Sequence, residues 1–226
     1  MVEINISTGF PYFTQRNNKI RPFITCNTTS MIAALFYRKV TFPTSTIYKQ
    51  PEDDLTNFLL TDSRVDAFYR KESPIEYSKY IIANKNPKIA YPPNQVHSVL
   101  SYGTNLWLGK SQNEITIFKQ TASIQEVLYE VIKGKPVVQG GLWNNLHHIT
   151  CIVGFSTSQD DIKDIKDSKD IDLSLVDSII MDDSFGDFHA GYKIQNGNDI
   201  RITTDEYHKL VIIQNSNIKM GHFFNV

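Results

Sequence analysis

Apolar residues recur at helical spacing in the chain up to Lys133, and they form short, strand-like runs after Gly134. Helices early and strands late are typical of an α+β domain. The sequence therefore predicts a helical part at about residues 26–133, packed against an antiparallel sheet at about residues 134–216. A chain of 226 residues is long enough for one well-buried domain, so residues 1–226 are expected to form a single domain.

The strongest helical signal begins at Cys26, where threonine and serine crowd the start. Apolar side chains recur behind it at Ile32, Leu35 and Phe36, on one side of a helix. This pattern predicts a buried helix that opens at about residue 26. Further helices are expected to begin near residues 51, 73, 94 and 123.

The second half of the chain predicts strands at residues 136–139, 148–155, 176–181 and 209–214. A charged stretch of low complexity, at about residues 156–173, separates the second of these strands from the third. We interpret this stretch as an insertion, either a solvated hairpin extension or a mobile loop.

Composition and charge exclude several classes of function. The formal net charge is -1 and the basic residues are scattered, so nucleic acid is not an expected partner. No stretch has the roughly 18 apolar residues that a membrane span needs. The N-terminus carries an early acid and lacks the apolar core of a secretory signal. We therefore expect a cytoplasmic protein, or one released without a signal peptide, for example by lysis. The oligomeric state stays open.

The two cysteines, Cys26 and Cys151, are far apart in sequence and form no C-x-x-C pair, which indicates a reducing compartment. Cys26 opens the expected buried helix, where unpaired backbone N–H groups and the helix dipole stabilise a thiolate. Such a thiolate can attack a carbonyl carbon. The alternative is that Cys26 is simply a small buried apolar residue.

Candidate partners for this thiol lie both upstream and downstream. His147 and His148 are adjacent on an expected strand and point to opposite faces, so only one of them can face the helix. The paired acids Asp182 and Asp183 end the next expected strand, where an acid could orient the imidazole. The amide of Gln15, together with the backbone N–H of the cysteine, could supply hydrogen bonds to a developing oxyanion.

Taken together, these segments resemble a known group of enzymes. The resemblance rests on F-P-Y-F-T-Q, then C-N-T-T-S-M after ten residues, then G-K-P-V-V, H-I-T-C-I-V-G-F and the turn D-S-F-G. In this order they are similar to the papain-like cysteine peptidases related to the double-glycine leader peptidases, and most similar to the stand-alone branch of that group. The motifs that carry the resemblance lie between about residue 10 and about residue 195. The stretch between about residues 40 and 120 contains little that is diagnostic of the group. The gap of about 120 residues between cysteine and histidine is close to that of papain-like enzymes.

The resemblance assigns roles to individual residues. It implies that Cys26 is the nucleophile, His148 the general base, Asp183 the orienting residue and Gln15 the oxyanion-hole donor. In the family the histidine stands six residues before a glycine, which selects His148 over its neighbour. The family's Asp-Pro/Ser-aromatic-Gly turn likewise selects the second acid of the pair. Asn27 departs from the family pattern, because relatives usually carry glycine after the nucleophile.

The resemblance also implies a papain-like α+β fold with the active site in the cleft between helices and sheet. The implied activity is hydrolysis of peptide bonds without a cofactor or metal, in peptidoglycan, as in bacterial and phage endolysins, or in another peptide. Leader-processing relatives belong to membrane exporters, and this chain shows neither a span nor a phosphate-binding loop, which disfavours that role. The lack of a separate wall-binding module stands against a wall hydrolase.

Other readings remain open at this stage. An amine acceptor in place of water would make the same triad a transpeptidase or another acyltransferase. The fold could also survive as a catalytically silent binding module. A metal site is disfavoured, because His148 and Cys151 face opposite sides of a strand and no ligand pair has the short spacing of structural zinc sites.

Overall fold

The computed structural model of the chain describes residues 1–143, 146–211 and 220–226. Its helices are α1 (Cys26–Tyr37), α2 (Pro51–Thr61), α3 (Ser63–Glu72), α4 (Pro74–Ile82), α5 (His97–Trp107), α6 (Ile124–Ile132) and α7 (Thr204–Val211). Its strands are β1 (Val2–Asn5), β2 (Thr116–Lys119), β3 (Val137–Trp143), β4 (Leu146–Thr157), β5 (Val176–Asp182), β6 (Ile200–Ile202) and β7 (Gly221–Phe224).

The strands form one antiparallel sheet in the order β2-β7-β3-β4-β5-β6. Strand β4 is its long central member. Its first part pairs with β3 on one edge, and its last residues pair with β1. Its other edge pairs with β5, beginning at Cys151 opposite Asp182. The predicted α+β fold, with helices packed on an antiparallel sheet, is confirmed.

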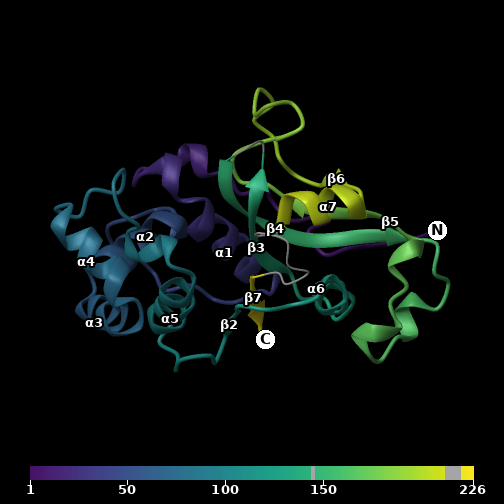
Figure 1. Ribbon diagram of the computed structural model, residues 1–226, viewed down its shortest axis with the longest axis horizontal. Helices are drawn as coiled ribbons and strands as arrows, with labels where there is room; N and C mark the ends of the chain where they lie inside the picture. Colours follow the sequence, from purple (N-terminus) through teal and green to yellow (C-terminus); the bar gives the residue numbers. More distant parts are fainter. Residues whose placement is uncertain (144–145, 212–219) are drawn as a thin grey trace.

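Two hydrophobic clusters hold helices against the two faces of the sheet. One joins α1, α2, α3 and α5 to the face of the sheet that carries Cys151, Val153 and Ile180. The other joins α6 and α7 to the opposite face, which carries Ile152 and Met181. Figure 1 shows α2 to α5 grouped on one side of the molecule, β4 and β5 extending to the other, and α1 between them. Helix α1 is therefore buried between the helical group and the sheet.

Local signals explain most of the helix ends. Helix α6 begins with a capping box, in which the Ser123 hydroxyl accepts from Glu126 N–H and the Glu126 carboxylate accepts from Ser123 N–H. Its C-terminal glycine, Gly134, has a positive φ of 74°. Helices α2 and α4 both begin with proline at a first-turn position. The helix starts expected near residues 26, 51, 73, 94 and 123 all have counterparts within a few residues.

The strand expected at residues 209–214 is wrong for its first three residues, which form the end of α7. A reciprocal cap starts this helix, because Thr203 and Glu206 exchange hydrogen bonds between side chains and backbone N–H groups. Tyr207 and Val211, four residues apart, bury their side chains on the same side. The helical spacing and the cap, rather than the apolar run, thus determine the conformation of residues 209–211. Residues 212–214 lie outside the described part of the chain.

Strands β1, β2, β6 and β7 were not predicted, because each has four residues or fewer and gains its stability from its partners. Strand β2 falls inside the range expected to be helical. The charged stretch forms short 3-10 turns at Ile162–Asp164 and Ser168–Asp170. Its Ile162 and Ile171 are buried in the cluster that contains α6. Apolar anchors thus fasten this stretch to the domain.

Candidate active site

Cys26 is the first residue of α1 and is partly buried. The preceding N-cap residue, Thr25, makes no side-chain hydrogen bond to the N–H groups at this end of the helix. The unpaired N–H groups and the helix dipole therefore stabilise negative charge near the sulfur. The structure places this cysteine where the sequence predicts a reactive thiol.

His148 lies between this cysteine and an acid. Its Nε2 is 2.6 Å from Asp183 Oδ1, and both side chains are buried. The same carboxylate oxygen accepts the backbone N–H of Phe185 at 2.9 Å, which holds the acid in place. Cys26 is also hydrogen-bonded to His148, and Nδ1 is the remaining polar atom of the ring. The structure therefore brings Cys26, His148 and Asp183 together in one chain of contacts.

These contacts shift the pKa values of the thiol and the imidazole in opposite directions. Burial by itself raises the pKa of Cys26, but the charge of His148, the hydrogen bond to its ring and the N–H of Ile149 lower it below the usual thiol value. Burial by itself lowers the pKa of His148, but the charges of the Cys26 thiolate and Asp183, with their hydrogen bonds, raise it to about 10. Both shifts favour a thiolate–imidazolium pair over the neutral thiol and imidazole.

The thiol and the imidazole come from opposite faces of the sheet. Ile149 and Cys151 pack on the face that α1 covers, so alternation alone sends the His148 side chain to the other face. Strand β5 pairs with β4 only from Cys151 onward, which leaves the edge of β4 at Ile149 to helix α1. There the Ile149 N–H points to the Cys26 sulfur, and the Ile149 carbonyl accepts from the Ser30 hydroxyl at 3.1 Å. Cys26 and His148 therefore meet around the edge of β4.

Asp182, the neighbouring acid, has a different environment. Its Oδ2 accepts the Tyr37 hydroxyl at 2.6 Å, and its Oδ1 accepts the backbone N–H of Asp199 at 2.9 Å. Burial raises its pKa to about 6, although both hydrogen bonds lower it. The side chain is part of a buried polar network that ties α1 to the loop before β6. The structure brings Asp183, rather than Asp182, to His148.

Contacts made by Arg16 and by two aromatic rings shape the loop that carries Asp183. The Arg16 guanidinium lies 4.2 Å from the centre of the Phe185 ring and donates to the carbonyl oxygens of Phe185 and Tyr192. The rings of Phe185 and Tyr192 both contact the His148 ring edge-to-face. Gly186 has a φ of 120° and lies so close to the Ile194 carbonyl that a Cβ would be 2.4 Å from its oxygen. The turn therefore requires glycine at this position.

Gln15 is buried and tied to the same loop. Its backbone N–H donates to the Ser184 carbonyl, and its Oε1 accepts the Ser184 hydroxyl at 2.8 Å. Its Nε2 donates to the Pro22 carbonyl at 2.7 Å, a bond that uses one of the two amide N–H groups. Gln15 is not among the residues that line the cavity at Cys26. The two side-chain bonds fix the orientation of the Gln15 amide. The second N–H of this amide takes part in neither bond.

Asn27 has a structural explanation for its departure from glycine. Its amide nitrogen donates to the Asn94 carbonyl, and its Oδ1 accepts the Thr28 N–H at 2.8 Å. Asn94 in turn donates to the Ile24 carbonyl at 3.2 Å. These bonds fasten the start of α1 to the 3-10 turn at Pro93–Gln95. A glycine at position 27 would supply neither of the two bonds that the Asn27 side chain makes.

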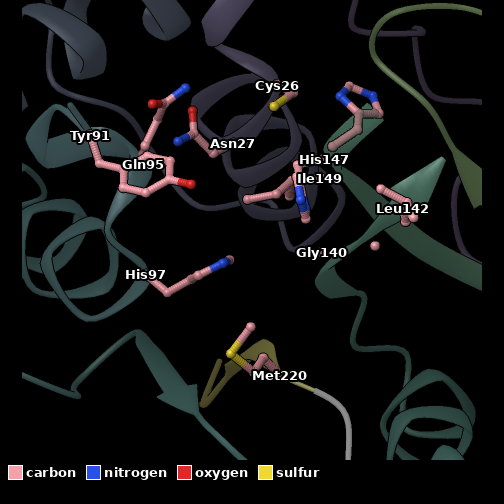
Figure 2. Close-up of a pocket in the computed structure, with 12 residues that line it drawn as sticks. Cys26, Asn27, Tyr91, Gln95, His97, Gly140, Leu142, His147, Ile149 and Met220 are labelled. Atoms are coloured by element: carbon pink, nitrogen blue, oxygen red, sulfur yellow. The ribbon is translucent and has the colours of Figure 1, made fainter. Parts of the chain in front are cut away.

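Cys26 opens onto a cavity of about 490 Å³ between the helical part and the sheet. Figure 2 shows Cys26 and Asn27 at one end, Met220 at the other and Tyr91, Gln95 and His97 along the helical side, and it also labels Gly140, Leu142, His147 and Ile149. His147 is exposed at the rim of this cavity. The cleft between helices and sheet is therefore where the thiol is accessible.

Several residues of this site carry no sequence signal of their own. Tyr91 and Gln95 flank Pro92 and Pro93 in the segment before α5, His97 is the first residue of that helix, and Tyr192 lies in an irregular segment. Periodicity does not apply to loops, so their approach to Cys26 or His148 depends on tertiary packing. Across the three described ranges, no three side chains among histidine, cysteine, aspartate and glutamate gather as a metal site.

None of the helices in residues 1–143, 146–211 and 220–226 combines the length and the apolar character required to cross a bilayer.

Comparison with known proteins gives one match at the level of families. The family model described as Peptidase_C39 like family matches residues 7–196, a range that includes Gln15, Cys26, His148 and Asp183. No match to the chain was found among curated proteins or among solved structures. The matched range covers well over half of the sequence, and the family is consistent with the α+β fold of the chain. The chain therefore belongs to the Peptidase_C39 like family, a group of papain-like cysteine peptidases.

Proposed function

We propose that the protein is a cysteine peptidase in which Cys26 is the nucleophile, His148 the acid and base, and Asp183 the residue that orients the histidine. The observation that carries this proposal is the continuous contact from Asp183 through the His148 ring to the Cys26 thiol. The opposite pKa shifts of Cys26 and His148 support it, since they favour the ion pair from which such enzymes react. Membership of the family supports the reaction class.

The proposed reaction begins with attack of the Cys26 thiolate on a peptide carbonyl carbon, which moves the carbonyl electron pair onto oxygen. Collapse of this intermediate breaks the C–N bond, and the His148 imidazolium gives its proton to the leaving amine. A thioester to Cys26 remains. His148 then takes a proton from water, whose oxygen attacks the thioester and releases the carboxylic acid. This release breaks the C–S bond and expels the Cys26 thiolate, which together with the proton now on His148 restores the ion pair.

The developing oxyanion needs hydrogen-bond donors that are already in position. The backbone N–H of Cys26 is one, because the first N–H groups of a helix have no partner within the helix. We propose the second amide N–H of Gln15 as the other. The two bonds that orient this amide, to Ser184 and Pro22, support the assignment, because a fixed donor avoids the cost of reorganisation.

The proposed substrate is a peptide, with the peptides of peptidoglycan as the first candidate. The open cavity at Cys26 is lined by uncharged and apolar side chains apart from histidines, which fits a neutral peptide backbone. We also propose that residues 1–226 act as a single catalytic domain. The hydrophobic cluster that joins α1 to the sheet supports this, since the cysteine comes from one part and the histidine from the other.

The test is to incubate the wild type and a Cys26→Ala variant with purified peptidoglycan and, separately, with a peptide library, and to identify the products by mass spectrometry. New amino and carboxyl ends that depend on Cys26 support the proposal. A parallel reaction with an added amine distinguishes hydrolysis from transfer, because an acyltransferase yields the amide product in preference to the acid. An unchanged product pattern in the Cys26→Ala variant would refute the role of the thiol.

A further inference from the structure

A pair of histidines outside the proposed triad lies at the same cavity. His97 Nδ1 is 3.0 Å from His222 Nε2, and the His97 ring stacks on Phe118 with an angle of 9° between the two planes. His222 is fully buried, whereas His97 lines the cavity that contains Cys26. The proposed reaction uses neither side chain. Their arrangement therefore requires another explanation.

The protons of this pair can be assigned from the surroundings of His222. Its Nδ1 is sealed from solvent and has no hydrogen-bond partner in the part of the chain that the structure describes. A buried N–H without a partner is rarer and costlier than an acceptor without one, so the proton belongs on His222 Nε2. His222 then donates to His97 Nδ1, which must accept. A neutral His97 consequently carries its own proton on Nε2.

This Nε2 faces the cavity. It makes no hydrogen bond within residues 1–143, 146–211 and 220–226, and the ring reaches across to strand β3. A Cβ built on Gly140 would lie 3.7 Å from His97 Nε2. Figure 2 shows His97 pointing from the helical side toward Gly140. A donor is therefore held in the passage between helix α5 and the sheet.

The passage continues beyond His97. A second cavity, of about 510 Å³, shares Tyr91, Gln95, His97 and Met220 with the one at Cys26. The two together form a groove that runs from the thiol past His97 toward Phe118.

We propose that this groove is a peptide-binding subsite in which His97 Nε2–H, fixed by His222, donates to a backbone carbonyl of the substrate. The inference rests on the proposed function and names the recognition chemistry of the same site. Apart from the Cys26–His148 pair, Glu76 is the one charged residue along the groove within the described residues, and no lysine or arginine lines it. A neutral carbonyl therefore suits it better than a carboxylate. Burial lowers the pKa of His97 to about 4, so the ring stays neutral at the pH of the reaction.

The proton assignment is tested first, because it needs no substrate. Two-bond ¹H–¹⁵N spectra of the wild type at pH 7 distinguish the two neutral forms of each imidazole, with His97→Gln and His222→Gln variants used to assign the signals. We expect the Nε2–H form for both rings. Observation of His222 in the Nδ1–H form would overturn the proposal, since His97 would then present a lone pair to the groove.

Binding is tested with two reagents that both alkylate Cys26. Iodoacetamide is too small to need the groove, whereas an N-acetyl-dipeptide vinyl sulfone must place its backbone in a subsite. We expect His97→Phe, which keeps the stacked ring, to weaken saturable binding of the vinyl sulfone about tenfold, the scale of one lost hydrogen bond. His97→Gln, which retains an N–H donor, is expected to restore most of the loss. Both variants should react with iodoacetamide at the wild-type rate.

Gly140→Ala provides an independent variant, because the added methyl group narrows the groove at ordinary contact distance and leaves the His97–His222 pair intact. Gly140→Ala is also expected to slow the alkylation of Cys26 by the vinyl sulfone and to leave the alkylation by iodoacetamide unchanged. Equal rates for both reagents in wild type, His97→Phe and Gly140→Ala would overturn the subsite. Failure of the proposed function looks different: Cys26 would then react with iodoacetamide as an ordinary thiol, while the histidine spectra would still decide the donor.

Discussion

The His148 ring lies between Asp183 and Cys26, with Nε2 2.6 Å from Asp183 Oδ1 and the thiol hydrogen-bonded to its other side. The acid favours the charged ring, which in turn favours the thiolate, and this effect through the imidazole opposes the weaker direct repulsion by which the Asp183 charge raises the pKa of Cys26. This arrangement predicts different effects for substitutions of Cys26 and Cys151, and for substitutions of the neighbouring acids Asp182 and Asp183.

Cys26→Ala is expected to abolish turnover and leave the free energy of unfolding almost unchanged, because the partly buried thiol contributes little packing. Cys151 is fully buried between sheet and α1, and burial raises the pKa of its thiol, so it stays protonated. Cys151→Ala is expected to cost about 1–2 kcal/mol of stability and little activity. Denaturant unfolding and peptide turnover of both variants check this division, which equal loss of activity would contradict.

Asp183→Asn is expected to retain part of the activity, because the amide oxygen can still accept the imidazole N–H. Asp183→Ala should lose more, since removal of the acceptor lowers the pKa of His148 and raises that of Cys26 toward the free-thiol value. The pH profile of Cys26 alkylation measures this directly.

Asp182→Ala is the control for this experiment, because its carboxylate bonds to Tyr37 and Asp199 and not to His148. It should lower stability and leave the alkylation profile in place. A profile that shifts in Asp182→Ala and not in Asp183→Ala would mean that the neighbouring acid orients the ring.

The charge pair also predicts the alkaline limit of turnover. The pKa of His148 is raised to about 10, so the imidazolium persists at neutral pH and is lost as the pH rises through about 10. Turnover needs this proton for the leaving amine and should fall there, whereas alkylation of the thiolate should stay at its plateau. The raised pKa of His148 contributes stability that is fully present below the unfolded pKa of histidine. This stability is lost as the pH rises from that value through about 10. Loss of turnover already near pH 7 would contradict the ion pair.

Asp182 predicts a separate dependence of stability on pH. Its pKa is raised by burial to about 6, from 3.8, so between these values the folded protein holds a proton that the unfolded chain has lost. Stability from this group is therefore expected to decrease by about 3 kcal/mol as the pH rises from about 4 to about 6. Urea unfolding of the wild type and Asp182→Asn across this range checks the sign, because the variant cannot titrate.

Gln15→Ala is expected to reduce kcat about 100-fold or more, the usual cost of one lost oxyanion donor, with little change in the Cys26 alkylation profile. Ser184→Ala removes the hydroxyl that orients the Gln15 amide and should cause a smaller loss. Single-turnover measurements on a cleaved peptide separate these effects from binding. A wild-type kcat in Gln15→Ala would remove Gln15 from the oxyanion hole.

Local pattern was sufficient for most of the longer elements, although helix α3 (Ser63–Glu72) was not predicted. The serine and threonine residues behind Cys26, the proline starts and the capping box of Ser123 specify helices through contacts within a few residues. The four-residue strands at the sheet edges gave no such signal, because their pairing partners are remote in sequence. The apolar run after Lys209 was misread as a strand for the same reason, since a cap at Thr203 and burial against the sheet decided its conformation.

The sequence by itself determined which residue types were available and in what order: a cysteine opening a helix, a histidine on a strand, an acid in the following turn and an upstream glutamine. Strand alternation left the choice between His147 and His148 open. The family resemblance favoured His148, and the tertiary structure shows how this side chain reaches Cys26, because β5 stops pairing with β4 at Cys151 and leaves an edge around which Cys26 reaches the opposite face. Where one strand stops pairing with another is set by long-range packing, which local spacing does not contain.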